Sequence, residues 1–254
     1  MHSTTLLAIF LSSGIALTGT SASSLSKIKR KETLLNEFLA DLLKYLPAID
    51  EPLVDATSVI TDLDSVLADL TGANTTENQL IDGSSCDEYT LIFARGTAEP
   101  GNMGVLVGPP LVWALQDIVG TDGLTIQGVN NYSASVEGYL EGGDPDGSDN
   151  MASLISEAYS SCPDTKLIVG GYSQGCQIVH NAISELDATT AAWIDKVVLF
   201  GDPDDGEAMS NVDSSNVYTV CNSKDDICDD GDIITVWHLI YAENVTAAAE
   251  WATS

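Results

Sequence analysis

The sequence predicts an α/β fold: a three-layer sandwich in which a small five-stranded parallel sheet has helices on both faces. Two observations beyond residue 85 predict it. Short runs rich in β-branched and aromatic residues alternate with segments of helical periodicity. These short runs are apolar almost throughout, which is typical of parallel strands buried on both faces. We expect this domain to span residues 81–254 and to follow an N-terminal helical extension.

The predicted elements follow one another in a regular order. We expect strands at 89–94, 124–129, 166–169, 196–200 and 216–220. We expect helices at about 108–119, 148–160, 174–186 and 239–252. Because parallel strands need long crossover connections, which are usually helices, this alternation favours a parallel sheet.

The first residues indicate the compartment. An apolar stretch of 14 residues runs from Leu6 to Gly19 and is followed by the small residues of 20–22. It is too short to span a bilayer and is typical of a secretory signal peptide, the alternative being a buried core segment. We therefore expect residues 1–22 to be a signal peptide, and the mature protein to be secreted and extracellular without a stable membrane anchor.

Residues 23–80 predict a helical extension or pro-segment that ends in a linker. Between 32 and 70, apolar residues lie three and four positions apart, which predicts two amphipathic helices broken near Pro47 and Pro52. Residues 71–78 are rich in Gly, Asn and Thr, which predicts a linker. Two interpretations stay open: a propeptide or helical cap on the domain, or a flexible tether.

Processing and glycosylation signals are expected in a secreted chain. Lys29 and Arg30 resemble a dibasic processing site. Acceptor sequences for N-glycosylation begin at Asn74, Asn131 and Asn244, so we expect a glycoprotein if the secretion route is eukaryotic.

The charge balance excludes several classes of partner. The chain has 38 Asp and Glu against 9 Lys and Arg, a formal net charge of −29. Such a surface repels the phosphates of nucleic acids and anionic lipids. We therefore expect no nucleic-acid partner and no docking at an anionic membrane, and we expect neutral substrates and a monomer.

A candidate nucleophile stands at a strand-to-helix junction. The pentapeptide 171–175 reads Gly-Tyr-Ser-Gln-Gly, directly after the predicted strand 166–169 and before the predicted helix 174–186. This context is typical of a nucleophile elbow, in which both glycines are needed because side chains there would collide with the neighbouring strand and helix. The turn would leave the hydroxyl of Ser173 projecting at the top of the sheet.

An elbow serine needs a base to remove its proton and an acid to orient that base. His2 lies in the predicted signal peptide, and His180 lies about two helical turns beyond Ser173, which indicates a satisfied or surface histidine. His238 remains, in a loop-like position after an apolar run. The order Ser, Asp, His requires an acid between Ser173 and His238, and many acids satisfy order alone.

The cysteines narrow this choice. Five are present, Cys86, Cys162, Cys176, Cys221 and Cys228, so two disulfides and one free thiol are the simplest accounting for a secreted chain. A bridge between Cys221 and Cys228 would pin a loop that contains Asp225 and Asp226. A bridge between Cys86 and Cys162 would then tie the first strand to the segment that enters the elbow strand. Cys176 is better explained as a small buried hydrophobe than as a catalytic thiol.

Four motifs now occur in order. They are Phe-Ala-Arg-Gly-Thr at 93–97 with Glu-Pro-Gly-Asn at 99–102, the pentapeptide 171–175, Asp225 between Cys221 and Cys228, and His238 beyond them. In these motifs the chain resembles the cutinase family of secreted serine esterases, which have an α/β hydrolase fold. The resemblance covers about residues 85–253 and leaves 1–80 unmatched.

The resemblance implies roles for individual residues. It implies that Ser173 is the nucleophile, His238 the general base and acid, and Asp225 the residue that orients His238, with Asp226 as the weaker alternative. It implies an oxyanion hole from the backbone N–H and hydroxyl of Thr97 and the backbone N–H of Gln174. The same family pairs the cysteines as proposed above.

The expected function is hydrolysis of cutin-type or short- to medium-chain acyl esters. Apolar residues that flank the predicted site would suit an acyl chain, although ordinary packing explains them equally well: Leu106, Val107, Leu111, Ile233, Ile234 and Val236. No cluster of residues has metal-ligand spacing, so we expect no metal and no cofactor. Two alternatives stay open, an acetylxylan esterase-type deacetylase and a non-catalytic secreted surface protein that has kept the fold.

Overall fold

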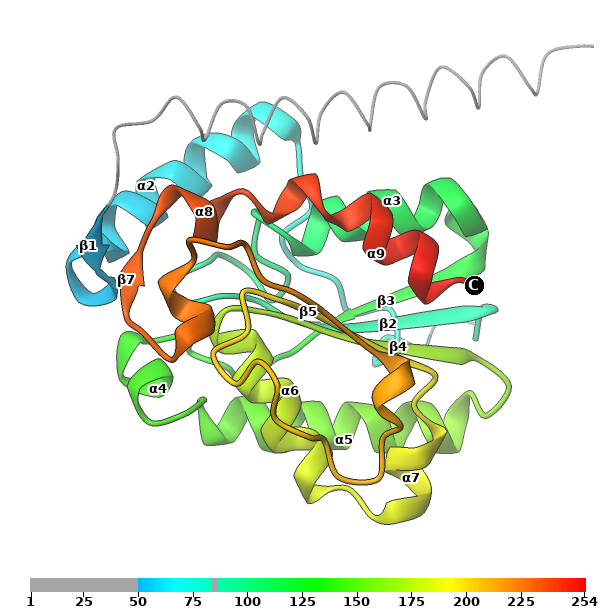
Figure 1. Ribbon diagram of the computed structural model, residues 1–254. Helices are drawn as coiled ribbons and strands as arrows, with labels where there is room; N and C mark the ends of the chain where they lie inside the picture. The colour runs from blue at the N-terminus through cyan, green and yellow to red at the C-terminus, as the bar shows by residue number, and fades with distance from the viewer. Residues whose placement is uncertain (1–49, 84–85) are drawn as a thin grey trace, which may run out of the picture.

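The computed structural model describes residues 50–83 and 86–254 (Figure 1). Three predicted features lie outside these residues: the signal peptide, the dibasic processing site and the first amphipathic helix. None of the described helices is long and apolar enough to cross a membrane.

The central sheet has five parallel strands, one in each apolar run that predicted a strand. From one edge to the other they are β3 (Leu124–Gly128), β2 (Tyr89–Ala94), β4 (Lys166–Tyr172), β5 (Lys196–Phe200) and β6 (Val217–Val220). β4 continues past the predicted run because Gly170 and Gly171 still pair with β2 and β5. Parallel pairing brings the carboxyl ends of all five strands to one edge of the sheet.

Helices cover both faces of this sheet, as the sequence predicts. In Figure 1, α3 (Gly108–Val119) and α9 (Val245–Ala252) pack together on one face. α5 (Pro145–Ser161), α6 (Gln174–Glu185) and α7 (Ala188–Trp193) cover the other face. The fold is therefore the predicted three-layer sandwich.

Two hydrophobic cores lie on either side of the sheet. Successive side chains of a strand point to opposite faces, so Leu91 and Phe93 of β2 join the core beneath α3 and α9. Ile92 and Ala94 join the core beneath α5 and α6. Because both faces are covered, all six residues of β2 are buried, which explains why Thr90 is the one clearly polar residue in this run.

The C-terminal helix is shorter than predicted. The sequence pattern predicted one helix over 239–252, but the structure has α8 (Val236–Leu239), a 3-10 turn at Tyr241–Glu243 and then α9. Ile240 leaves the helical region with φ −101° and ψ 18°, which breaks the helix. Apolar periodicity does not reveal this break, because residues on both sides of it pack into the same core.

Several short elements have no clear sequence pattern. They include α4 (Val136–Leu140), the 3-10 turns at Thr121–Gly123, Ser214–Asn216 and Asp226–Asp229, and a two-stranded antiparallel sheet of β1 (Glu51–Pro52) and β7 (Ile233–Ile234). These elements are too short for a hydrophobic period to develop.

Helix α2 (Leu53–Thr71) is the described part of the N-terminal extension. It begins directly after Pro52, as predicted, and it ends at Gly72, whose left-handed φ of 66° terminates the helix. Its buried side chains Leu53, Ala56, Ile60 and Leu67 belong to the same core as α3 and α9. In Figure 1, α2 lies on the outside of the domain beside β1 and β7.

The predicted linker after α2 is bound along the domain. The side chain of Asn102 accepts the N–H of Glu77 at 2.9 Å and donates to its carbonyl at 3.0 Å. Asn78 forms an antiparallel bridge with Gln127 of β3. These bonds fix the path of the chain from α2 to the sheet.

A disulfide between Cys86 and Cys162 ties the segment before β2 to the end of α5, across 76 residues of chain. In the chain-entropy account, closing a loop of this size stabilises the fold by about 4 kcal/mol.

We expect Cys86→Ser combined with Cys162→Ser to lower the free energy of unfolding by about 2 to 5 kcal/mol in urea titrations. An unchanged urea midpoint with an unchanged slope would contradict this expectation.

Candidate active site

Ser173 lies in a tight turn between β4 and α6. Its backbone has φ 55° and ψ −126°, a strained conformation for a residue other than glycine. A Cβ at Gly171 would lie 2.5 Å from the carbonyl oxygen of Gly175, and a Cβ at Gly175 would lie 2.1 Å from that of Ala94. Both glycines are therefore required by close backbone approaches, as expected of a nucleophile elbow.

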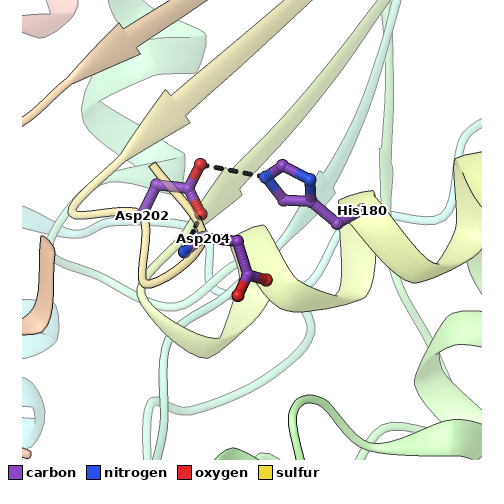
Figure 2. Close-up of side chains that lie close together, drawn as sticks. All are labelled: His180, Asp202 and Asp204. Atoms are coloured by element: carbon purple, nitrogen blue, oxygen red, sulfur yellow. Dashed lines mark hydrogen bonds and ion pairs between the residues drawn. The ribbon is translucent and has the colours of Figure 1, made fainter. Parts of the chain in front are cut away.

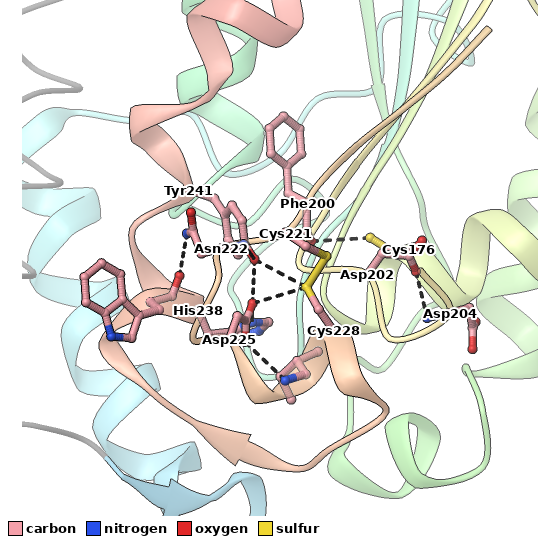
Figure 3. Close-up of a disulfide and its surroundings, with 12 residues drawn as sticks. Cys176, Phe200, Asp202, Asp204, Cys221, Asn222, Asp225, Cys228, His238 and Tyr241 are labelled. Carbon is pink, nitrogen blue, oxygen red and sulfur yellow. Dashed lines mark hydrogen bonds and ion pairs between the residues drawn. A yellow bond between two sulfur atoms is a disulfide. The ribbon is translucent and has the colours of Figure 1, made fainter. Parts of the chain in front are cut away.

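His238 and Asp225 form a buried pair (Figure 3). Nδ1 of His238 lies 2.8 Å from Oδ2 of Asp225, and their side chains are 2% and 0% exposed. Burial would raise the pKa of Asp225, but the charge of His238 and the hydrogen bonds that the carboxylate accepts hold this pKa below its usual range. The ionised carboxylate accepts the Nδ1 proton, which leaves Nε2 of His238 free to accept another.

A disulfide between Cys221 and Cys228 closes the loop that contains Asp225. The neighbouring Asp226 has a different partner: its Oδ2 accepts the N–H of Ile233, at the start of β7, at 3.1 Å. The structure therefore brings Asp225, and not Asp226, to His238.

Two tyrosines that sequence reasoning missed contact this pair. The ring of Tyr172 stacks on the ring of His238 at 5.1 Å, and its hydroxyl donates to the His238 carbonyl at 2.9 Å. The hydroxyl of Tyr241 donates to Oδ2 of Asp225 at 2.5 Å. The sequence offered only their positions: Tyr172 lies inside the elbow pentapeptide, and Tyr241 lies three residues after His238. Neither position by itself indicates a role.

Thr97 and Gln174 meet beside the elbow. Nε2 of Gln174 donates to Oγ1 of Thr97 at 2.8 Å and to the carbonyl of Ser135 at 2.7 Å. Because the Thr97 oxygen accepts this bond, its own proton stays available to donate elsewhere. Gln174 is the first residue of α6, so its backbone N–H has no carbonyl partner within the helix. Both groups are donors that suit a negatively charged oxygen.

Buried Glu99 organises the loop that contains Thr97. Its carboxylate accepts the backbone N–H groups of Gly96, Val105 and Leu106 at 2.8, 2.9 and 2.8 Å. Nε of Arg95 donates to the carbonyl of Glu99 at 2.7 Å. Glu99 thus supports the loop from within.

A small closed cavity lies beside Ser173, His238 and Thr97. It is lined by Leu53, Ile60, Thr97, Glu99, Leu106, Tyr172, Ser173, Ile234, His238 and Leu239. Its volume of about 10 Å³ is close to the space that one water molecule needs. Leu53 and Ile60 belong to α2, so this helix closes the cavity over Ser173, which is only 3% exposed.

The predicted acyl-contacting residues have different positions. Leu106 and Ile234 line the cavity. Val107 is fully buried at the start of α3, Ile233 pairs with Pro52 between β7 and β1, and Val236 begins α8. Only the first two thus contact the closed cavity.

α2 also buries a carboxyl group. Asp64 is 1% exposed, and neither carboxylate oxygen has a hydrogen-bond partner among the described residues. Burial, together with the negative charge of Glu99, raises the pKa of Asp64 to about 9. Burial raises the pKa of Glu99 too, but its three N–H donors and Arg95 oppose this. Asp64 therefore holds the proton at neutral pH.

His180 lies outside the cavity lining, consistent with its position along α6. Its Nε2 pairs with Oδ2 of Asp202 at 3.0 Å, and Oδ1 of Asp202 accepts the N–H of Asp204 at 3.1 Å (Figure 2). Burial would lower the pKa of His180, but the two aspartates raise it, which favours a charged pair. Among the described residues, possible metal-ligand atoms of these three side chains lie within 4.8 Å of one another, but His180 and Asp202 already satisfy each other.

Cys176, the remaining thiol, is fully buried in the core beneath α5 and α6. Burial raises the pKa of this thiol well above its ordinary value, which keeps it protonated. Its place agrees with the prediction of a small buried hydrophobe.

The fold and this constellation define a class of protein. A serine on a strained strand-to-helix turn, followed along the chain by Asp and His that pair with each other, is the arrangement of an α/β hydrolase.

Comparisons with known proteins give the family. Residues 85–254 match the family model described as Cutinase. The curated cutinase cut1 of Trichoderma harzianum is 45% identical over 88% of this chain and 87% of its own, and a cutinase of Hypocrea jecorina is 46% identical over 85% and 84%. The chain therefore belongs to the cutinase family and is a serine esterase.

Solved structures agree with this assignment. The Trichoderma reesei cutinase in complex with a C11Y4 phosphonate inhibitor has a TM-score of 0.71 at 44% identity, covering 87% of this chain and 97% of that chain. An acetyl xylan esterase has a TM-score of 0.55 at 20% identity, over 66% and 98%, which shows a shared fold alone.

Asp64 makes the stability of the packed α2 depend on pH. The pKa of about 9 in the folded state lies above the ordinary value of 3.8, so the stabilisation is complete below pH 3.8 and is lost as pH rises to 9. The loss approaches about 1.4 kcal/mol per pH unit for one group. We expect Asp64→Asn to raise the melting temperature at pH 7 to 8 and to have little effect at pH 4. A variant less stable than the parent at pH 8 would exclude this account.

Proposed function

We propose that the protein hydrolyses cutin-type esters or esters of short to medium acyl chains, with Ser173, His238 and Asp225 as its catalytic triad. The proposal rests chiefly on the buried 2.8 Å contact between His238 and Asp225, whose histidine lines the same cavity as Ser173. An orienting carboxylate on Nδ1 leaves Nε2 as the base for the serine proton.

The reaction divides into two acyl transfers. Oγ of Ser173 attacks the ester carbonyl carbon while Nε2 of His238 takes the hydroxyl proton. The bond to the alcohol oxygen then breaks, and His238 gives its proton to the departing alcohol. Water attacks the acyl-enzyme with the same histidine as base, which releases the carboxylic acid and restores the Ser173 hydroxyl.

The oxyanion formed in each step needs donors. We assign this role to the N–H and hydroxyl of Thr97, which lines the cavity with Ser173, and to the backbone N–H of Gln174, which follows Ser173 directly. Each well-placed donor of this type contributes about 3 to 4 kcal/mol to stabilisation of the transition state. The side-chain bond from Gln174 to Thr97 holds the hydroxyl in position at 2.8 Å.

Substrate entry requires a wall of the cavity to move, and we propose that this wall is α2. A cavity of about 10 Å³ holds one water molecule and no ester, and Leu53 and Ile60 form its α2 wall. We propose that the described structure is a closed state, in equilibrium with an open state in which α2 has left the cavity. This gives the helical extension the role of a cap on the domain.

The setting of the reaction follows from the rest of the chain. We propose a secreted, monomeric, glycosylated enzyme that acts outside the cell. The acceptor residues Asn74 and Asn131 are exposed, and Asn244 is half-buried. The formal net charge of −29 favours neutral ester substrates over anionic ones.

An ester series tests the proposed function. We expect hydrolysis of p-nitrophenyl esters to rise from acetate to butyrate or longer chains, and Ser173→Ala to lower kcat by about 10⁴-fold or more because no nucleophile remains. Activity confined to acetate would favour an acetylxylan esterase-type deacetylase. Substantial activity in Ser173→Ala would refute the triad.

Two neighbouring residues of α2 test the closed state. Ile60 is 4% exposed and lines the cavity, whereas Val59 is 47% exposed. Ile60→Ala removes apolar contacts of the closed state, so we expect kcat/KM for p-nitrophenyl butyrate to rise several-fold, up to about tenfold. Val59→Ala, the matched control, should leave kcat/KM unchanged. Equal effects of the two variants, or a fall in activity with Ile60→Ala, would argue against a closing role for α2.

A further inference from the structure

We propose that Tyr241 is a positioning residue of the active site: its hydroxyl fixes the Asp225 carboxylate in the ionised form and in the orientation that holds His238. This inference rests on the proposed roles of Asp225 and His238. It adds a fourth residue to the proposed triad of Ser173, His238 and Asp225. This residue touches neither substrate nor nucleophile and acts through Asp225.

The direction of the Tyr241 hydrogen bond is fixed by its neighbours. The hydroxyl oxygen accepts the backbone N–H of Asn222 at 3.1 Å and lies 2.5 Å from Oδ2 of Asp225. A backbone N–H only donates, and the disulfide sulfur of Cys228 is a weak acceptor 3.6 Å away, so the single hydroxyl proton of Tyr241 is directed at the much closer carboxylate. Figure 3 shows dashed lines from the hydroxyl to Asp225 and to the sulfur of Cys228.

The donors around Asp225 require it to be ionised. Oδ2 receives both the Tyr241 hydroxyl and Nδ1 of His238, and Oδ1 receives the N–H of Ile227 at 3.2 Å. A protonated carboxyl group would lose one of these three bonds. Burial raises the pKa of Asp225, and the bonds from His238 and Tyr241 are among the interactions that lower it below the ordinary value.

Tyr241 also links the acid loop to the histidine segment. Asn222 follows Cys221 directly, and its side chain donates to the carbonyl of Trp237 at 2.7 Å. Its N–H bond to the Tyr241 hydroxyl is therefore a second tie between the loop that contains Asp225 and the segment that contains His238. The Tyr241 ring packs edge-on against the His238 ring, with 6.1 Å between the ring centres, whereas the Tyr172 ring stacks on the His238 ring.

A buried tyrosine hydroxyl always needs a partner, so burial alone does not indicate a role. Tyr241 differs from an ordinary core tyrosine because its partner is the acidic oxygen that also binds His238. Its ring is fully buried, and burial together with Asp225 raises the pKa of its hydroxyl, which stays a neutral donor across the working pH range.

Tyr241→Phe tests the inference, because it keeps the ring and removes the hydroxyl. We expect kcat for p-nitrophenyl butyrate to fall about tenfold at constant KM, the size of one charge-assisted hydrogen bond. We also expect the acid limb of the kcat/KM profile to move to higher pH, because a carboxylate with one donor fewer favours the protonated imidazole more strongly. Tyr89→Phe, a buried tyrosine whose hydroxyl meets Lys166 and Thr253 instead, is the control and should retain wild-type kcat.

A double-mutant cycle with Asp225→Asn separates positioning from general support of the fold. If Tyr241 acts through the carboxylate, Tyr241→Phe costs less than twofold in the Asp225→Asn background. An equal loss in both backgrounds, or an acid limb that superposes on the wild type, would overturn the inference.

If Tyr241→Phe does not fold, 3-fluorotyrosine at position 241 replaces it in the test. This side chain keeps the hydroxyl as a stronger donor, so the acid limb should move to lower pH, and an unchanged limb would overturn the inference. Ser173→Ala, measured in parallel, distinguishes a failure of the Tyr241 inference from a failure of the proposed triad. An inactive Ser173→Ala with a wild-type Tyr241→Phe rejects Tyr241 alone, whereas an active Ser173→Ala rejects the proposed triad.

Discussion

Parallel pairing of β2, β4, β5 and β6 brings four carboxyl ends to one edge of the sheet, and the groups of the site follow those ends. Thr97 comes after β2, Ser173 after β4, and Asp225 after β6. Chain segments more than a hundred residues apart therefore meet without long excursions. The elbow depends on this pairing directly, since a Cβ at Gly175 would lie 2.1 Å from the carbonyl oxygen of Ala94 in β2.

Two buried aspartates show how surroundings decide the state of one side chain. Asp225 accepts bonds from His238, Tyr241 and Ile227, and its pKa is lowered despite burial. Asp64 has no partner among the described residues, and its pKa is raised to about 9. Donors stabilise a buried carboxylate, while their lack makes burial favour the neutral acid. The first environment fits the orienting role proposed for Asp225, and the second ties the packing of α2 to pH.

In the closed cavity, the packing that stabilises α2 also blocks access to Ser173. Leu53 and Ile60 gain by burial against the domain, and their packing covers Ser173, the proposed nucleophile. Burial of Leu53 and Ile60 favours the packed position of α2, whereas burial of Asp64 without a hydrogen-bond partner among the described residues opposes it. Such a balance suits a segment that moves.

The sequence by itself determined the five strands, the layer order and the elbow that contains Ser173, because buried parallel strands are apolar almost throughout and an elbow needs its glycines locally. Cysteine spacing and elimination narrowed the partners to His238 and a short acidic loop. Tertiary structure alone decided two things: the tyrosines that contact His238 and Asp225, and the closure of the cavity by α2. It also brought Asp225, which the family resemblance already favoured over Asp226, to His238. Each depends on contacts between segments distant along the chain, which local periodicity does not encode. The break between α8 and α9 was missed for a related reason, since both pieces bury the same apolar pattern in one core.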